Sequence, residues 1–452
     1  EGMTRPSMRA TRALARRGAA PAARASRIAA CFAFGAALAC AAHVEPRPGA
    51  PLVPGDAEGG VAAVAEAQRR AHAAHHAAAG PEPAGAVTRD EEAARASFFT
   101  TYRSAAELSA ALTAKLATGV CAHCAPLGSL ALTAEGRFVS GVMLGTQQGA
   151  RRDGPEPQLP ATPAPLVLIT AGVHAREWAA VMGMHYALDR LLELDIMSDD
   201  PVARVLASGA VRFAVVPLVN PDGYEHSRNS LPWFRGNRNT SMSGGGACPP
   251  VAFETTLGKT GTAPGDWGVD LNRNFDGYGS FGIGGVSGPC DVAQNFPGQQ
   301  PFDQAETAGI KALIESELAQ GTTVLMSIDQ HSFGPYILHP YGWCHPWFCP
   351  RHPQEERVAE IARRLAAAAQ AVAGTAYAPI PSSQLYPVGG ALDDWISDVT
   401  TRGGRAGIGI TVELTDYNTF FPAEGDLLER AGEETLAWLR EAILIAGEEA
   451  SG

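Results

Sequence analysis

Four short apolar segments, separated by longer helical patterns, constrain the fold of this chain more than any other feature. The apolar segments are Leu166–Thr170, Val211–Val219, Val324–Asp329 and Gly407–Leu414. Near-continuous apolar strands are expected where both faces of a sheet are covered. Helical patterns cover Glu177–Leu194, Gln304–Leu318, Gln354–Val372 and Leu427–Ile445. The alternation predicts an α/β sandwich with helices on both faces of the sheet.

The first part of the chain differs in composition from the rest. Residues 1–42 combine Arg-rich segments with the apolar stretch Ile28–Ala39 and small residues after it, a pattern typical of a secretory signal peptide. An organelle transit peptide is the alternative, because such leaders are also rich in Arg and poor in acidic residues. Residues 43–95 are rich in Ala, Gly, Pro and His and predict a disordered or loosely helical spacer. Residues 96–452 are the predicted folded domain.

Charge and cysteine content narrow the class of protein. A formal net charge of -12 argues against nucleic-acid binding, which needs clustered Lys and Arg. The cysteines beyond the leader are Cys121, Cys124, Cys248, Cys290, Cys344 and Cys349. An even number of cysteines after a signal peptide favours disulfides. Cys344 can pair locally with Cys349. Cys121 and Cys124 predict a loop disulfide, because no second C-x-x-C or His pair lies at zinc-finger spacing.

The segment Val173–Trp178 places a His and a Glu three residues apart, soon after an apolar run. The imidazole of His174 and the carboxylate of Glu177 can reach one ion from a single turn, and this donor set suits zinc better than magnesium. The pattern His-x-x-Glu occurs by chance in many proteins, so it is weak evidence alone. His331 follows another predicted strand and supplies a third candidate ligand. Sites in open α/β sheets lie beyond the carboxyl ends of strands.

Several further motifs occur in a fixed order around these ligands. They are Asn220–Tyr224, Phe234–Arg238, Asp270–Phe275, Ser327–Ser332, Tyr386–Trp395 and Thr411–Leu414. From about Phe98 to the C-terminus, this series resembles the zinc metallocarboxypeptidases of the pancreatic A/B type. The resemblance implies a catalytic domain over residues 96–452, built as one sandwich around a mixed, mostly parallel eight-stranded sheet. It also implies a disulfide between Cys248 and Cys290.

The resemblance assigns the metal centre and the catalytic groups. One Zn²⁺ per chain is expected on His174, Glu177 and His331. Asp270 is expected to accept the other N–H of His174, although an Asp that only caps the following turn remains an alternative. Glu413, at the end of an apolar strand, is the expected general base and acid.

Arg235 is expected to stabilise the negative charge that develops on the substrate carbonyl oxygen. The family usually has a Trp directly before this Arg. In this chain Phe234 stands between Trp233 and Arg235, so Arg238 remains the alternative.

The resemblance also assigns the residues that bind the substrate. Asn272 and Arg273 match the pair that binds a free C-terminal carboxylate, which a planar guanidinium can hold with two hydrogen bonds. Tyr386 matches a mobile tyrosine that closes over the substrate terminus, and Arg176 is expected to face the next residue of the substrate. Asp393 aligns with the base of the side-chain pocket, where an aspartate favours Lys or Arg by charge pairing. Alternatively, Asp393 is the N-cap of a helix from Trp395 onward, unless Asp394 takes that place.

These features predict a secreted zinc exopeptidase that removes C-terminal residues from peptides and proteins and leans towards Lys and Arg. The expected partners are substrates with a free C-terminus, with no nucleic acid and no membrane span after leader removal, and the chain is expected to be a monomer. The same mechanism with apolar or aromatic preference is the first alternative. An inactive binding protein on the same fold and an enzyme for another amide substrate are the others.

Overall fold

The computed structural model describes residues 97–146, 163–239, 241, 268–285, 294–402, 407–414 and 419–451. All of them belong to one compact unit, Ala65–Gly452. The predicted leader, the predicted spacer, Cys248 and Cys290 lie outside the described residues. The domain boundary at residue 96 therefore stays a prediction.

A mixed eight-stranded sheet forms the centre of this unit, in the order β1-β2-β4-β3-β5-β8-β6-β7. The strands are β1 (Cys124–Leu132), β2 (Phe138–Leu144), β3 (Leu166–Ala171), β4 (Arg212–Val216), β5 (Val324–Ser332), β6 (Tyr336–His339), β7 (Ala378–Pro381) and β8 (Ile408–Leu414). Strands β4, β3, β5 and β8 run parallel, as do β6 and β7. The pairings β1–β2, β2–β4 and β6–β8 are antiparallel. The predicted fold class is confirmed.

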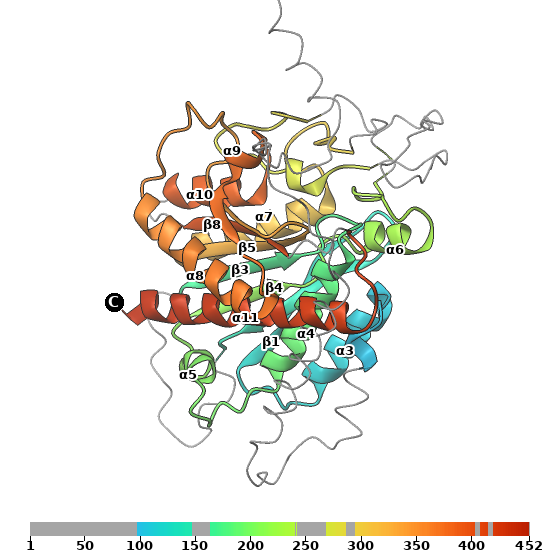
Figure 1. Cartoon of the computed structure of the whole chain (residues 1–452), viewed down its shortest axis with the longest axis vertical. Helices are drawn as coiled ribbons and strands as arrows, with labels where there is room; N and C mark the ends of the chain where they lie inside the picture. Colours follow the sequence, from blue (N-terminus) through green and yellow to red (C-terminus); the bar gives the residue numbers. More distant parts are fainter. Residues whose placement is uncertain are drawn as a thin grey trace, which may run out of the picture. The chain divides into compact units, whose positions relative to one another are not determined.

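Helices cover both faces of the sheet (Figure 1). They are α3 (Ala105–Ala117), α4 (Trp178–Leu192), α5 (Pro201–Ser208), α6 (Pro221–Asn229), the 3-10 turn η2 (Leu271–Arg273), α7 (Ala305–Ala319), α8 (Glu355–Ala373), α9 (Ser382–Leu385), α10 (Leu392–Arg402) and α11 (Asp426–Ser451). Figure 1 shows α11, in red, with α4 and α8 beside it. In the described part of the chain, no helix combines the length and apolar character that a membrane span needs.

The side-chain alternation of β3 explains the two layers of helices. Successive residues of a strand point to opposite faces. Leu166 and Leu168 pack in a core with residues of α7 and α10. Val167 and Ile169 pack in a second core with residues of α4, α5, α8 and α11. Both faces are thus buried, which is why the sequence of β3 is apolar without a polar face.

One predicted strand extends too far. The apolar run Val211–Val219 continues beyond β4, which ends at Val216. Pro217 follows, and proline has no backbone N–H for the ladder. The chain then turns, and the Asn220 side chain accepts from Gly223 N and caps α6. The other three predicted strands and the four predicted helices agree with the structure within a few residues, apart from α11, which continues to Ser451.

The sheet brings three distant parts of the chain to one edge. The carboxyl ends of β3, β5 and β8 lie side by side, because these strands are parallel neighbours. Thr170 is the register partner of Asp329, and His331 is the register partner of Glu413. The predicted ligand His174 follows β3 by three residues. A ligand site at this edge agrees with the general rule for open α/β sheets.

Candidate active site

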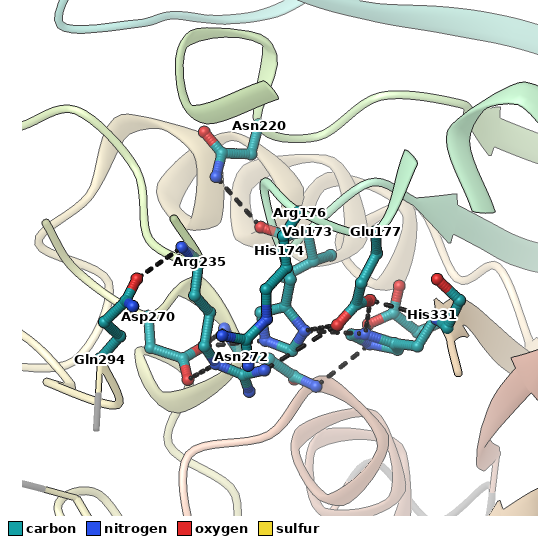
Figure 2. A network of polar contacts seen from close by, with 12 residues as sticks. Val173, His174, Arg176, Glu177, Asn220, Arg235, Asp270, Asn272, Gln294 and His331 are labelled. Atoms are coloured by element: carbon teal, nitrogen blue, oxygen red, sulfur yellow. Dashed lines mark hydrogen bonds and ion pairs between the residues drawn. The ribbon is translucent and has the colours of Figure 1, made fainter. Parts of the chain in front are cut away.

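Three buried side chains converge beyond the ends of β3 and β5. The Nδ1 atom of His174 lies 2.8 Å from Glu177 Oε1 and 3.0 Å from His331 Nδ1. His331 Nδ1 lies 2.8 Å from Glu177 Oε2. Figure 2 shows the three side chains directed toward one another. Candidate ligand atoms of all three lie within 4.8 Å of one another. Two imidazoles and one carboxylate in this arrangement fit a zinc ion and leave a position open.

The turn between β3 and α4 directs His174 and Glu177 to the same point. Gly172 has a φ of 66°, and a Cβ there would lie only 2.7 Å from Val181 Cγ2, so the turn requires glycine. Glu177 stands at the N-cap position of α4, but its side chain makes no capping hydrogen bond. Its carboxylate is therefore available to the two histidines.

Asn220 holds this turn in place, a role that sequence reasoning did not assign. Its side-chain Nδ2 donates to the Val173 carbonyl oxygen at 3.1 Å (Figure 2). It also donates to the Gly236 carbonyl oxygen at 2.9 Å. The same side chain caps α6 through Oδ1. One buried amide thus links the His174 turn to the segment that carries Arg235.

Asp270 contacts three groups of the site at once. Its Oδ1 lies 3.0 Å from His174 Nε2 and accepts from Asn272 N at 3.0 Å. Its Oδ2 accepts from Arg235 Nε at 2.8 Å. The two interpretations of Asp270 from sequence are therefore compatible, because the carboxylate both caps η2 and faces the histidine.

A second buried carboxylate, that of Asp329, contacts His331. Its Oδ2 is 2.7 Å from His331 Nε2. Sequence reasoning does not single out this residue, because it is the last residue of the predicted strand Val324–Asp329. The available signal was its spacing, since residues two apart on a strand share a face.

Glu413 and Arg235 line the same cleft as the three candidate ligands. Burial raises the pKa of Glu413 to about 8, and the nearby Glu177 carboxylate acts in the same direction. Burial opposes the charge of Arg235, but the Asp270 carboxylate raises the pKa of this guanidinium above its ordinary value. The alternative Arg238 points elsewhere: its Nε lies 3.2 Å from Glu135 Oε1, and it does not line the cleft.

The cleft, counted with the solvent space at its opening, has a volume of about 530 Å³. Nine of the residues singled out from sequence line it: His174, Glu177, Arg235, Asn272, Arg273, His331, Tyr386, Asp393 and Glu413. Arg273 Nη2 donates to Tyr386 Oη at 3.3 Å. Tyr386 is 46% exposed, which places it at the mouth of the cleft and leaves its side chain room to move.

Arg176 does not line the cleft. Its Nη1 donates to the Trp233 carbonyl oxygen at 3.3 Å, and its guanidinium lies 4.5 Å from the centre of the Phe420 ring. Burial lowers the pKa of Arg176 to about 10. The structure thus places this residue against the Phe420 ring and the Trp233 backbone, next to the metal motif.

Asp393 and Asp394 are both buried but have different neighbours. Asp393 lines the cleft, and its Oδ2 accepts from Ser382 Oγ at 2.9 Å. Asp394 accepts from the backbone N–H groups of Gly342 and Trp343, at 3.1 and 2.8 Å. Helix α10 already begins at Leu392, so the interpretation in which either aspartate caps a helix from Trp395 is wrong. Burial raises the pKa of Asp393 above its ordinary value.

The loop disulfide expected at Cys121 and Cys124 and the local pairing open to Cys344 and Cys349 are both present. Cys121 is bonded to Cys124, and Cys344 is bonded to Cys349. The second bond closes a loop that follows Gly342, a residue of the cleft.

Residues 119–437 match the zinc carboxypeptidase family. A metallocarboxypeptidase A-like protein of Trichophyton verrucosum is 30% identical over 280 residues, which cover 61% of this chain and 57% of the relative. Carboxypeptidase O of Bos taurus is 28% identical over 286 residues, covering 63% and 65%. The matched part is therefore little more than half of the fungal relative.

Two solved structures share the fold. The carboxypeptidase A from Helicoverpa armigera has a TM-score of 0.59 and 23% identity, over 87% of this chain and 82% of that one. Bovine thrombin-activatable fibrinolysis inhibitor, in complex with tick carboxypeptidase inhibitor, has a TM-score of 0.58 and 18% identity, over 78% and 99%.

Proposed function

Since this chain belongs to the zinc carboxypeptidase family, we propose that it is a zinc-dependent exopeptidase that removes single residues from the C-termini of peptides and proteins. The observation that carries the proposal is the convergence of His174, Glu177 and His331 on one point, in the same cleft as Glu413. The three residues are the proposed ligands of one zinc ion. When bound, zinc supplies Lewis-acid activation of a water molecule and of the scissile carbonyl.

Glu413 is the proposed general base and acid. It lines the cleft beside His331, its register partner on β5. Burial raises its pKa to about 8, so the side chain can take a proton from water and give it to the leaving amine. Arg235 is the proposed partner of the negative charge that develops on the carbonyl oxygen. Asp270 holds the Arg235 guanidinium at 2.8 Å and thereby fixes its direction.

Recognition of a free C-terminus is assigned to Asn272, Arg273 and Tyr386. A guanidinium can hold a carboxylate through two hydrogen bonds, and the Asn272 amide adds a donor. The contact between Arg273 and Tyr386 allows the phenol to close over the bound terminus. Arg176 is proposed to act on the penultimate substrate residue, from its place next to Phe420.

Asp393 is the proposed determinant of a preference for Lys and Arg. A buried carboxylate in the side-chain pocket gains a charge partner when a cationic side chain enters, and an apolar side chain offers none. The neighbouring Ser382 hydroxyl already orients this carboxylate.

Hydrolysis of two blocked dipeptides, one ending in Lys and one in Phe, tests the proposal. The full chain is assayed with and without a zinc chelator, and the Glu413→Gln variant is the control. We expect chelator-sensitive release of Lys well above Phe, and little release by the variant. Release of Phe above Lys would keep the mechanism and reject the basic preference. Zinc-loaded, folded protein without release of either residue would favour an inactive binding protein or a different amide substrate.

We further propose that the protein is secreted and acts as a monomer, with Cys248 paired to Cys290. The apolar stretch after a basic segment and the two disulfides of the described residues support an oxidising compartment. Peptide mapping of the secreted protein without reduction tests the Cys248 pairing, and finding either cysteine alkylated would reject it.

A further inference from the structure

We propose that Asp329 is a second positioning residue of the metal centre, which orients His331 and strengthens zinc binding through its own negative charge. The inference deepens the proposed function, because it concerns the same zinc ligands. Asp329 itself is not a ligand, and it acts through His331.

The Asp329 carboxylate contacts the ring nitrogen of His331 that faces away from the proposed metal. Asp329 is 1% exposed, and its Oδ2 lies 2.7 Å from His331 Nε2. Its other oxygen, Oδ1, accepts from Thr170 Oγ1 at 2.7 Å. His331 directs the opposite ring nitrogen, Nδ1, toward Glu177 and His174. A proton on Nε2, donated to Asp329, leaves Nδ1 free to bind a metal.

The fold fixes this arrangement on rigid elements. Asp329 and His331 are two residues apart on β5, so both side chains emerge on the same face. Thr170, the register partner of Asp329 on β3, anchors the carboxylate from the neighbouring strand. On the other side, Asp329 pairs in register with Thr411 of β8. Sites built on central strands hold their geometry more closely than sites on loops.

The charges around the two histidines are not equivalent. Asp270, behind His174, is neutralised in part by Arg235 Nε at 2.8 Å. Among the described residues, Asp329 has no ion pair with an Arg or Lys, and its nearest titratable partner is the His331 imidazole, at 2.7 Å. A buried carboxylate without a cation is costly. A divalent ion on His331 would supply the missing positive charge. An aspartate at position 329 should therefore stabilise the zinc-bound state more than an uncharged asparagine does.

The Asp329→Asn variant separates charge from shape, because the amide oxygen can still accept the hydrogen bond from His331. Zinc affinity of the full chain is measured by competition with a chromophoric chelator. Loss of such a supporting partner typically weakens metal binding by about 10- to 100-fold, and we expect a change in this range. The Asp222→Asn variant is the matched control. Asp222 is also fully buried, but its carboxylate binds Arg137 Nη1 and Glu135 N, so zinc affinity should not change.

The Thr170→Val variant provides a second route to the same result. It leaves Asp329 and its charge in place and removes the hydroxyl that anchors Oδ1. We expect a smaller loss of zinc affinity than for Asp329→Asn, because only the orientation is loosened. If Asp329→Asn does not fold, unchanged affinity in Thr170→Val overturns the proposal.

Zinc titration tests the role of Asp329, and peptide hydrolysis tests the proposed function, so the two proposals can be rejected separately. Unchanged zinc affinity in a folded Asp329→Asn variant overturns the role of Asp329, whatever the peptidase assay shows. Reduced affinity in this variant, together with no hydrolysis by the zinc-loaded parent chain, would support the role of Asp329 and reject the proposed function. Failure of the parent chain to bind zinc would overturn both.

Discussion

At the scale of single residues, the cleft contains buried carboxylates whose neighbours differ and whose proposed tasks differ accordingly. Glu413 lies beside His331 on the adjoining strand. Asp393 is held by Ser382 Oγ in another part of the cleft lining. Asp394, next in sequence, binds two backbone N–H groups. Substitutions at these three positions should therefore give three distinct results.

The Glu413→Gln substitution should remove proton transfer and leave zinc binding intact. A positioned general base or acid typically contributes about 10²- to 10⁴-fold to the rate, so we expect kcat to fall within this range. Zinc content, measured on the same protein, should be unchanged because Glu413 is not among the three converging ligands. A variant that keeps the parent kcat would reject Glu413 as the base.

The Asp393→Leu substitution should exchange the preferred C-terminal residue. Without the carboxylate, the pocket loses its partner for a cation and gains apolar surface, so kcat/KM should fall for Lys and rise for Phe. Each change should reach about tenfold or more, as is usual for one charged or apolar contact in a pocket.

Asp394→Asn is the matched control for this exchange, because it alters the contacts to Gly342 and Trp343. It should lower the melting temperature without inverting the preference. Equal selectivity in the parent chain and in Asp393→Leu would show that Asp393 does not determine specificity.

The residues found from sequence are those whose motifs are short and local. His174 and Glu177 share one turn, and Glu413 interrupts an apolar strand. Asp329 and Asn220 act through partners on other strands or loops, and such contacts follow from register, which the sequence does not display. The position of Arg176 against Phe420 depends on side-chain packing between distant segments and was likewise not predictable.

At the scale of elements, helix α7 carries two buried glutamates with opposite responses to pH. Burial raises the pKa of Glu306 from 4.5 to about 7. Glu317 is also buried, yet hydrogen bonds from Arg212 and Thr322 lower its pKa below the ordinary value. The two ends of one helix should therefore contribute to stability in opposite pH ranges.

Glu306→Gln should stabilise the protein at neutral and alkaline pH. A raised pKa favours folding fully below about pH 4.5, and this contribution is lost as the pH rises through about 7. A glutamine at this position cannot ionise, so the variant keeps the free energy of unfolding that the parent chain loses when Glu306 ionises, about 3 kcal/mol at most. Its free energy of unfolding, compared with the parent chain by urea titration, should be similar at acid pH and larger above pH 7. A constant difference across this range would contradict the prediction.

Glu317→Gln should have the opposite effect and serves as the matched comparison. A lowered pKa contributes stability above the unfolded value, and the contribution is lost as the pH falls. This variant should be less stable than the parent chain at neutral pH, and the difference should shrink on acidification. If Glu317→Gln and the parent chain are equally stable at pH 7, the ion pair between Glu317 and Arg212 contributes nothing to stability.

Elements could be predicted where their pattern is strong. Strands β3, β5 and β8 are nearly all apolar and were found. Strand β1 has one buried residue, Cys124, among half-buried and exposed ones, and β6 and β7 have four residues each, so none of the three has a clear pattern. Their places in the sheet depend on pairing, of β1 with β2, of β6 with β8 and of β7 with β6.

At the scale of the whole molecule, the proposed metal site lies beyond the ends of the central strands. Both faces of the central strands are covered by apolar cores. Removal of zinc should therefore abolish hydrolysis without unfolding the chain.

We expect a chelator to lower the melting temperature reversibly and to leave the helical circular dichroism signal intact. A ligand at 1,000 times its Kd adds about 4 kcal/mol to stability, which sets the scale of the change. Zinc added back should restore hydrolysis and the melting temperature. Magnesium, added at the same concentration as the zinc, is the control and should restore neither, because the ligand set contains two imidazoles. Loss of the helical signal in chelator would show that the fold depends on the metal.

Strand β8 enters the sheet between β5 and β6, two strands that precede it in the chain. During synthesis, all three proposed zinc ligands leave the ribosome before Glu413 does. Assembly of the complete cleft therefore requires a strand that is synthesised after both of its neighbours in the sheet.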